Sequence, residues 1–158
     1  MAHSPTIMFR VEQPGSGAAV SLIRQLDEDL FRRYPEMPAP LVHGLHPADL
    51  TNPNFTFLVA RIDNRPVGCG ALRDLEPGVG EVKRMFVVPE FRGQGIAKQI
   101  LAALETRARE LGYATVRLET GNEQPEAISL YKTSGYHQIA AFGEYADNTF
   151  SVCFEKQL

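Results

Sequence analysis

The sequence lacks the features of a membrane-spanning, exported or nucleic-acid-binding protein. No apolar run approaches the roughly 18 residues that a membrane helix needs. The N-terminus, MAHSPTIMFR, has no basic start, apolar stretch and small-residue cleavage site of a signal peptide. Basic residues are not in excess, since 16 lysines and arginines face 19 acidic residues for a formal net charge of -3. We therefore expect a cytoplasmic protein with neither a nucleic-acid nor a membrane partner.

Cysteine is scarce, and metal-ligand spacing is missing. The two cysteines, Cys69 and Cys153, form no metal-binding pair and no disulfide framework, so we expect buried thiols in a reducing compartment. His43 and His46 stand three positions apart in a proline-rich loop, without a third ligand nearby. The sequence therefore predicts no metal site.

What is present is the composition of an ordinary globular domain. With 158 residues, 44% hydrophobic and 22% charged, the chain fits one domain spanning residues 1–158. Apolar spacing predicts helices from about Val20 to Arg33, Gly95–Leu111 and Pro125–Thr133, with a short turn of helix near His46–Leu50. Strands are predicted at Thr6–Glu12, Phe55–Ile62, Val67–Asp74, Glu81–Val88, Thr115–Glu119, Tyr136–Phe142 and Phe150–Glu155.

The order of these elements predicts an α/β fold with a mixed sheet. Three consecutive strands read as an antiparallel meander, and Asp63-Asn64-Arg65-Pro66 reads as the turn between the first two. The strand–helix–strand unit that follows implies parallel pairing between Glu81–Val88 and Thr115–Glu119. Helices are then expected to pack on the sheet.

The segment RGQGIAK, Arg92–Lys98, lies at the start of the second long helix. The first amides of a helix have no internal partner, the helix dipole adds positive charge there, and glycines let a ligand approach the backbone. The pattern is typical of a pyrophosphate site. It is neither a Walker loop nor a dinucleotide fingerprint, and the alternative is a plain tight turn with a solvated Arg92.

The stretch PEFRGQGIAKQIL resembles the acyl-CoA-binding motif R/Q-x-x-G-x-G/A of the GNAT superfamily of N-acetyltransferases. EVKRMFVV before it and ETGNEQPEAISLYKTSGY after it are similar to the flanking family segments, so the resemblance covers most of the chain. It implies a GNAT-like acyl-CoA N-acyltransferase fold, with a splayed central mixed β-sheet flanked by helices. It also implies acetyl-CoA as cosubstrate, without a metal, and a β-bulge in the strand before the motif.

The resemblance assigns cofactor contacts position by position. The amides of Gln94 to Lys98 would hold the CoA pyrophosphate, and the end of the preceding strand would pair with the pantetheine arm. The family asparagine of N-x-x-A is replaced by Gln124, while Asn122 lies two residues earlier, so the pantetheine contact falls to either residue. The expected cofactor-binding residues are Phe86, Val87, Val88, Arg92, Gly93, Gln94, Gly95, Ile96, Ala97, Lys98, Asn122 and Gln124.

Two residues are expected to move protons. Glu81 matches the base of the histone-acetyltransferase branch, and Tyr131 of LYKTSGY matches the tyrosine near the CoA sulfur. The Val87 amide would meet the oxyanion. The alternatives are a solvent-exposed Glu81, or one that holds Lys83 or Arg84, and a core Tyr131 with a satisfied hydroxyl.

The acceptor pocket implied by the resemblance contains Tyr34, Glu36, Arg84 and Tyr145. Its charges suit an ammonium, and Arg84 suits a carboxylate, so we expect a small-molecule primary amine such as an amino acid. A protein or peptide amine stays open, as do a CoA-binding module without turnover and a phosphate- or nucleotide-binding protein. Many relatives pair through their last strands, which makes a homodimer an open alternative.

Overall fold

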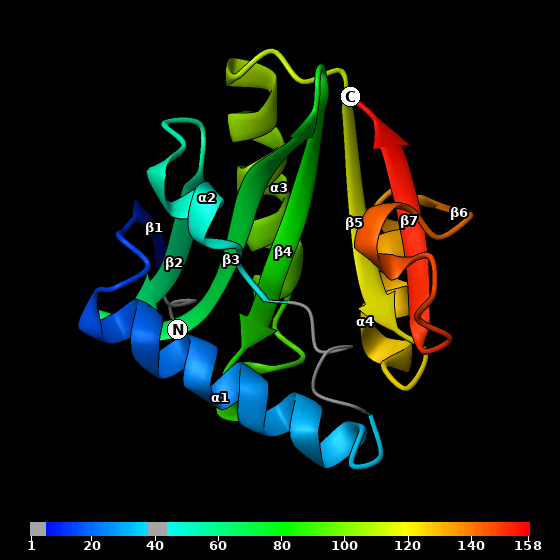
Figure 1. Cartoon of the computed structure of the whole chain (residues 1–158). Coiled ribbons are helices and arrows are strands. Elements are labelled where there is room, and N and C mark those ends of the chain that lie inside the picture. The colour runs from blue at the N-terminus through cyan, green and yellow to red at the C-terminus, as the bar shows by residue number, and fades with distance from the viewer. Residues whose placement is uncertain (1–5, 38–43) are drawn as a thin grey trace.

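The computed structural model describes residues 6–37 and 44–158, and Figure 1 shows the arrangement of their elements. Among these residues no helix combines the length and the apolar character needed to cross a bilayer. The elements are β1 (Ile7–Val11), α1 (Gly17–Arg33), α2 (Pro47–Thr51), β2 (Thr56–Ile62), β3 (Arg65–Glu76), β4 (Val79–Val87), η2 (Pro89–Phe91), α3 (Ile96–Glu110), β5 (Thr115–Gly121), α4 (Pro125–Thr133), β6 (His137–Ile139), η3 (Gly143–Tyr145) and β7 (Ser151–Gln157).

The strands form one mixed sheet in the order β1-β2-β3-β4-β5-β7-β6. Within the described residues, β4 and β5 are the parallel pair, and the other neighbours run antiparallel. Helix α3 connects the two parallel strands, as the strand–helix–strand pattern predicts. The mixed sheet with flanking helices confirms the predicted fold class.

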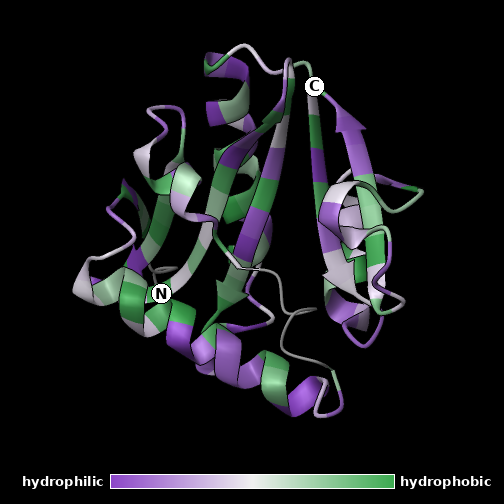
Figure 2. Ribbon diagram, viewed as in Figure 1, coloured by the Kyte–Doolittle hydropathy of each residue, from purple (hydrophilic) through white to green (hydrophobic). Residues whose placement is uncertain are grey.

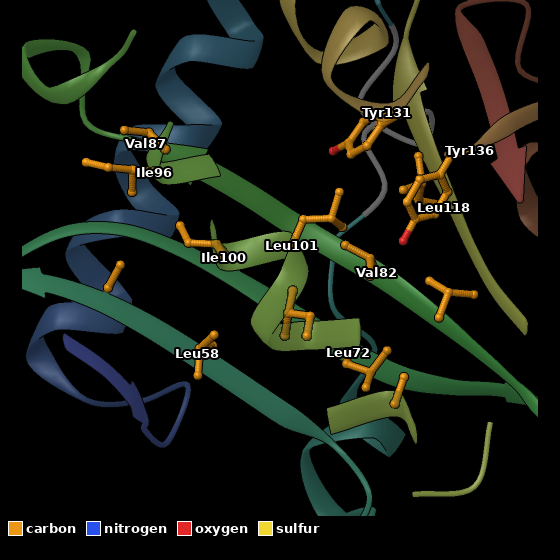
Figure 3. Packing of buried hydrophobic residues seen from close by; sticks show 14 of the residues in the cluster. Leu58, Leu72, Val82, Val87, Ile96, Ile100, Leu101, Leu118, Tyr131 and Tyr136 are labelled. Atoms are coloured by element: carbon orange, nitrogen blue, oxygen red, sulfur yellow. The ribbon is translucent and has the colours of Figure 1, made fainter. Parts of the chain in front are cut away.

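Helices cover both faces of the sheet, because alternate residues of a strand point to opposite sides. On β2, Leu58 and Ala60 belong to the core beneath α3, whereas Phe57 and Val59 belong to the core beneath α1. Figure 1 shows α1 in front of the sheet and α3 behind it. Figure 3 shows the α3 side, where the aliphatic side chains of α3 face those of β2, β3 and β4.

The packing of α3 on the sheet follows from its sequence. Its buried side chains recur on one face at helical spacing, and they include Ile96, Ile100, Leu104 and Ala108. Gly70 of β3 lets this face come close: a Cβ there would lie 2.8 Å from Leu104 Cδ1. The helix therefore sits tightly on the middle of the sheet and fixes where its first turn lies.

Two parts of the sheet differ most from the prediction. The segment Tyr136–Phe142 is not a strand throughout: β6 covers His137–Ile139 only, and η3 follows. β6 pairs with a short part of β7, at Cys153–Glu155, and β7 pairs fully with β5 on its other side. The hairpin between β2 and β3 also turns more tightly than expected. Asp63 and Asn64 both have positive φ, 48° and 68°, which fits a two-residue turn.

The parallel strands part after four paired positions. Pairing runs from Val79 opposite Thr115 to Val82 opposite Leu118, although β4 continues to Val87 and β5 to Gly121. Figures 1 and 2 show the two strands together at one end and separated at the other. We call the opening beyond Val82 and Leu118 the fork. Past it, the facing edges of β4 and β5 have no strand partner among the described residues, as the resemblance implied.

A β-bulge lies in β4 at the fork. Cys69 faces Phe86 and Ala71 faces Lys83, so Gly70 alone stands opposite Arg84 and Met85. Arg84 has φ 58°, a left-handed conformation that a residue with a side chain rarely adopts. Its guanidinium bonds Asp27 of α1 at 2.5 Å, and its carbonyl accepts from Cys69 Sγ at 3.3 Å. Such contacts hold a conformation that costs about 1–3 kcal/mol.

The far end of the fork is bridged by α1. Arg33 forms an ion pair with Glu126 of α4 and donates to the Glu123 carbonyl at 3.2 Å. The next residue, Tyr34, accepts a 2.9 Å hydrogen bond from the Glu123 amide. The end of α1 is therefore tied to the turn between β5 and α4, across the opening.

Candidate active site

One cavity of about 480 Å³ occupies the fork. Its walls come from α1, the unpaired part of β4, the start of α3, the end of β5 and α4. It brings together twelve of the eighteen residues that the sequence singled out: Arg84, Phe86, Val87, Arg92, Gly93, Gly95, Ile96, Ala97, Lys98, Gln124, Tyr131 and Tyr145. The other six, Tyr34, Glu36, Glu81, Val88, Gln94 and Asn122, do not line it.

The start of α3 presents unpaired amides at the cavity wall. Gly95 is the N-cap and has no side chain to satisfy them, and the first helical bond runs from the Gln99 amide to the Gly95 carbonyl at 3.2 Å. No acceptor in the described part of the chain takes the amides of residues 93–98. Gly93 and Gly95 both have φ 78°, and no atom lies within 4 Å of where their Cβ would be. The loop therefore exposes donors toward open space, with the positive end of the helix dipole behind them.

Arg92 joins this loop to the end of β4. Its Nε donates to the Val87 carbonyl at 2.9 Å, and its guanidinium lies 5.4 Å from the centre of the Phe86 ring. A second side chain, Asp29 of α1, lies 3.8 Å from its Nη2. Arg92 is thus engaged with the protein, in contrast to a solvated arginine at a plain turn.

The backbone at the end of β4 faces two ways. The Val88 amide donates to the Val67 carbonyl of β3 at 2.9 Å, and the Val88 side chain is buried in the core beneath α1. Amides of successive strand residues point to opposite sides. The Val87 amide and carbonyl therefore point into the fork. Beyond it, Gln124 lines the cavity at the N-cap of α4, whereas the exposed Asn122 uses its amide on the Phe150 carbonyl.

Tyr131 lies on the cavity wall from α4. Its ring packs against Tyr136 and Phe154, with centroids 6.0 and 6.1 Å away, as Figure 3 shows for Tyr136. No residue in ranges 6–37 and 44–158 forms a hydrogen bond with the hydroxyl. Burial, together with the charge of Glu119, raises the pKa of this phenol far above its ordinary value. Tyr131 therefore stays protonated and can donate to a group that enters the fork.

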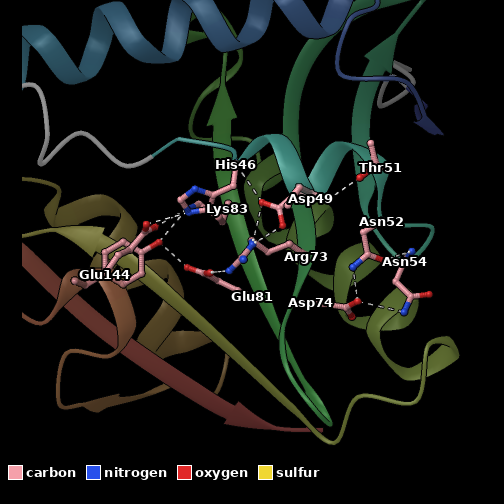
Figure 4. Close-up of polar contacts among 12 residues, drawn as sticks. His46, Asp49, Thr51, Asn52, Asn54, Arg73, Asp74, Glu81, Lys83 and Glu144 are labelled. Carbon is pink, nitrogen blue, oxygen red and sulfur yellow. Dashed lines mark hydrogen bonds and ion pairs between the residues drawn. The ribbon is translucent and has the colours of Figure 1, made fainter.

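Glu81 lies behind the cavity, inside a polar network that Figure 4 shows. It is 1% exposed. One carboxylate oxygen accepts from Arg73 Nη1 at 2.8 Å, and the other accepts from the Tyr145 hydroxyl at 2.6 Å. Both oxygens are thus engaged, and neither alternative from the sequence, solvent exposure or a bond to Lys83 or Arg84, describes it.

The same network continues to α2 and to the cavity wall. Lys83 donates to Glu144 at 3.2 Å and to the Tyr145 hydroxyl at 3.1 Å, and Glu144 also lies 3.0 Å from His46 Nε2. On the other side, Arg73 pairs with Asp49 of α2 at 2.9 Å. Figure 4 shows these side chains in a row from η3 to α2. The network ties the lining residues Lys83 and Tyr145 to fixed positions.

Of the expected acceptor residues, two line the cavity and two do not. Arg84 and Tyr145 form part of the wall. Tyr34 is buried at the end of α1, with its hydroxyl on the Glu123 amide, and Glu36 is exposed. Among the described residues, no group of three or more His, Cys, Asp or Glu side chains could hold a metal ion, and His43 lies outside those residues.

Glu119 is a titratable lining residue that the sequence reasoning missed. It stands at the carboxyl end of a parallel strand, one position beyond the last β4–β5 pair. Burial raises the pKa of Glu119 to about 7; the Lys83 ammonium opposes this shift, and the Glu81 and Glu144 carboxylates add to it. A carboxylate at the end of a parallel strand was a signal for the site, since ligands bind at that edge of open sheets.

Comparison with known proteins shows the family. Residues 19–136 match the sequence model of the acetyltransferase (GNAT) family. Over 155 residues the chain is 41% identical to a protein of Azospirillum brasilense named IAA acetyltransferase, covering 98% of this chain and 99% of the relative.

Solved structures of acyltransferases have the same fold as this chain. A Klebsiella pneumoniae structure described as an acyl-CoA N-acyltransferase has a TM-score of 0.79 and 34% identity, covering 96% of this chain and 97% of the other. A GNAT family acetyltransferase of Elizabethkingia anophelis, crystallised with acetyl-CoA bound, has a TM-score of 0.70 at 18% identity and covers 96% and 98%. The matched family model and the Azospirillum relative together show that the chain belongs to the acetyltransferase (GNAT) family and is an acyltransferase.

Proposed function

We propose that the protein transfers the acetyl group of acetyl-CoA to the primary amine of a small molecule, by direct attack within a ternary complex. One observation carries this proposal: a single cavity joins the unpaired amides at the start of α3 to the proton-carrying side chains at the fork. The first part suits a pyrophosphate and the second suits acyl transfer. The GNAT relative crystallised with acetyl-CoA supports the choice of donor.

The residues at the start of α3 fit the CoA pyrophosphate. The amides of Gln94 to Lys98 would donate to its oxygens, and open space beside Gly93 and Gly95 leaves room for them. Arg92 would shape the loop from its bond to Val87, and Lys98 would add positive charge. Val87 would pair with the pantetheine arm through the edge of β4, and Phe86 would line the same wall. Gln124 would lie on the opposite wall and Asn122 outside the cavity.

Tyr131 would serve as the general acid. Acyl transfer to an amine develops an oxyanion and then a thiolate, and both need a donor. The Val87 amide, which points into the fork, suits the oxyanion. The Tyr131 hydroxyl lines the same cavity and carries its proton at neutral pH, so it suits the thiolate.

The acceptor proposal rests on the size and charge of the fork. The cavity is ample for a small amine, and its polar wall at this end includes Glu119, Lys83, Arg84 and Tyr145. The amine of a protein or peptide is the alternative acceptor. The Azospirillum relative is named for IAA, so IAA belongs among the compounds tested.

A thiol-release assay tests the proposal. Acetyl-CoA and the protein are incubated with amino acids, simple amines, polyamines, peptides and IAA, and free CoA is measured with a thiol reagent. We expect release that depends on one class of small amine. Tight acetyl-CoA binding without release on any compound would indicate a CoA-binding module, and equal binding of ATP or NAD would indicate a general phosphate site. A homodimer stays a prediction, and sedimentation of the free protein measures it.

A further inference from the structure

The strand register singles out two charged residues at the fork. Val82 and Leu118 form the last β4–β5 pair, so Lys83 and Glu119 are the first residues that would have faced each other had the strands stayed together. Both line the cavity. They therefore stand where the unpaired edges of the two strands begin, on the walls of the space that a reacting group would enter.

The two residues differ in how they are paired. Lys83 is held by Glu144 and by the Tyr145 hydroxyl. The Glu119 carboxylate, by contrast, accepts no hydrogen bond and forms no ion pair with any residue in ranges 6–37 and 44–158. A half-buried carboxylate without a partner is unfavourable in its charged form, and a cation that reaches it gains most from binding there.

The arginines near this end of the cavity, in contrast, already have anionic partners. Arg84 bonds Asp27 at 2.5 Å, and Arg73 bonds Asp49 at 2.9 Å as well as Glu81 at 2.8 Å. A carboxylate on the acceptor would have to displace one of these partners. This end of the cavity thus provides a place for an ammonium and, in the described part of the chain, no unoccupied cation for a carboxylate.

We propose that Glu119 binds the ammonium group of the acceptor and takes its first proton, and that the acceptor is a cationic amine without a carboxylate beside the amine. The proposal rests on the proposed function and narrows it. It places the base on β5 rather than at Glu81 on β4, because Glu81 lies behind Tyr145 with both oxygens bonded.

In the proposed reaction, the ammonium of the acceptor gives one proton to the Glu119 carboxylate, which later releases it to solvent. The neutral nitrogen attacks the acetyl carbon, and the C–S bond breaks as the tetrahedral adduct collapses. The leaving sulfur takes the proton of the Tyr131 hydroxyl. The nitrogen then loses its second proton, which returns through water to the Tyr131 oxygen. The products are the N-acetyl amine, free CoA thiol and one proton in solution.

The surroundings of Glu119 suit this role. Lys83 and Glu81 face it from β4, Glu144 and Tyr145 from η3, and Tyr131 from α4. The charge of Glu119 also contributes to the raised pKa values of Cys153 of β7 and Tyr34 at the end of α1. Burial and the two carboxylates raise the pKa of Glu119 to about 7 against the opposing Lys83 ammonium. A base with this pKa is ionised enough to accept a proton near neutral pH and still holds it well.

A comparison of Glu119→Gln with Glu81→Gln tests the base. For wild type we expect kcat/KM to fall below a pKa of about 7. Glu119→Gln should lower kcat/KM by about 100-fold and remove this acidic limb. Glu81→Gln should keep the limb, and Glu76→Gln, at an exposed position at the end of β3, should behave as wild type. Calorimetry with acetyl-CoA shows that each variant is folded.

The outcomes separate the two proposals. A wild-type protein that binds acetyl-CoA and acetylates nothing overturns the proposed function. If the wild type is active, two results overturn the inference and leave the proposed function standing. One is an acidic limb of kcat/KM that survives in Glu119→Gln with the same pKa, and the other is a limb that disappears in Glu81→Gln. If Glu119→Gln does not bind acetyl-CoA, the pH profile of wild-type kcat/KM tests the inference instead. A wild-type profile without an acidic limb near neutral pH contradicts the role of Glu119.

Matched acceptors test the substrate class. The best amine found is compared with its carboxylated counterpart, as in phenethylamine with phenylalanine or tyramine with tyrosine. We expect kcat/KM for the amine to exceed that of the amino acid by at least about tenfold, or about 1.4 kcal/mol. An amino acid that reacts as well as the amine, or better, would overturn the class.

Discussion

The hydroxyl of Tyr145 donates a 2.6 Å hydrogen bond to the Glu81 carboxylate in the interior of the protein. The same oxygen accepts from Lys83 at 3.1 Å, so one phenol joins two charges of opposite sign. Burial and the Glu81 charge raise the pKa of Tyr145 far above its usual range, and the phenol remains a donor. This contact holds the cavity wall to the network behind it.

Replacing Tyr145 with Phe should therefore destabilise the protein. The change leaves a buried carboxylate oxygen and a buried ammonium each short of one partner, and we expect a loss of about 1–3 kcal/mol. Urea unfolding measures it. Tyr113→Phe is a matched control, because the Tyr113 hydroxyl is buried and has no hydrogen-bond partner among the residues that the structure describes. Its removal should leave stability unchanged or raise it; equal losses in both variants would contradict the role of the Tyr145 contact.

Replacing Gly95 with Asp should weaken acetyl-CoA binding. The change puts a negative charge and a side chain beside amides that we assign to a pyrophosphate, and we expect at least about a tenfold loss of affinity. Gly78→Asp is the control, since Gly78 has the same φ of 78° and the same open space in the β3–β4 turn. It carries the same backbone penalty without the cavity. Calorimetry that gives both variants wild-type affinity would rule out the start of α3 as the pyrophosphate site.

Replacing Tyr131 with Phe should lower turnover without changing acetyl-CoA affinity. Only the unpaired hydroxyl is lost, and the ring contacts with Tyr136 and Phe154 remain. We expect kcat to fall by about 100-fold, the usual effect of losing a positioned proton donor. Steady-state kinetics and calorimetry measure the two quantities. Wild-type turnover would remove Tyr131 from the mechanism.

Replacing Glu119 with Gln should also stabilise the protein at high pH. The pKa of Glu119 is raised from 4.5 to about 7 in the folded protein, so the folded state binds one more proton than the unfolded state between these values. Wild-type stability therefore falls as pH rises through this window and levels off above it. Since Glu119 is half-buried, we expect the variant to gain about 1–2 kcal/mol at pH 8 and little at pH 4. A gain of the same size at both pH values would contradict the raised pKa.

Local sequence predicted the elements better than their junctions. Helix α3 was predictable because its apolar spacing, its glycine entry and Gly112 past its end all favour the same helix. The strand predicted at Tyr136–Phe142 was wrong after Ile139. The length of this strand depends on how many residues of β7 pair with it, and no local sequence pattern determines that number. The fold class and the cavity wall at Arg92–Lys98 were also predictable, because there too several local signals of the sequence agree.

The fork was harder to predict. Its position depends on the register of β4 and β5 and on a bulge at Arg84, an arginine that local sequence gives no reason to place at positive φ. Without the register, Glu119 is one more acid at a strand end, and Glu81 looks equally available. Tertiary pairing puts one of them in the cavity and the other behind it.

The bridge from α1 to the turn before α4 has a consequence for how the enzyme can change. The two halves of the sheet are joined at one end by paired strands and at the other by Arg33 and Tyr34. The gap between them is thus held at both ends, and its width depends on Arg33 and Glu126, which line the same cavity as Glu119 and Tyr131. Substitutions at Arg33, Tyr34 or Glu126 can therefore widen or narrow the reaction chamber, and with it the range of acyl groups and amines admitted, while the chemistry inside stays intact.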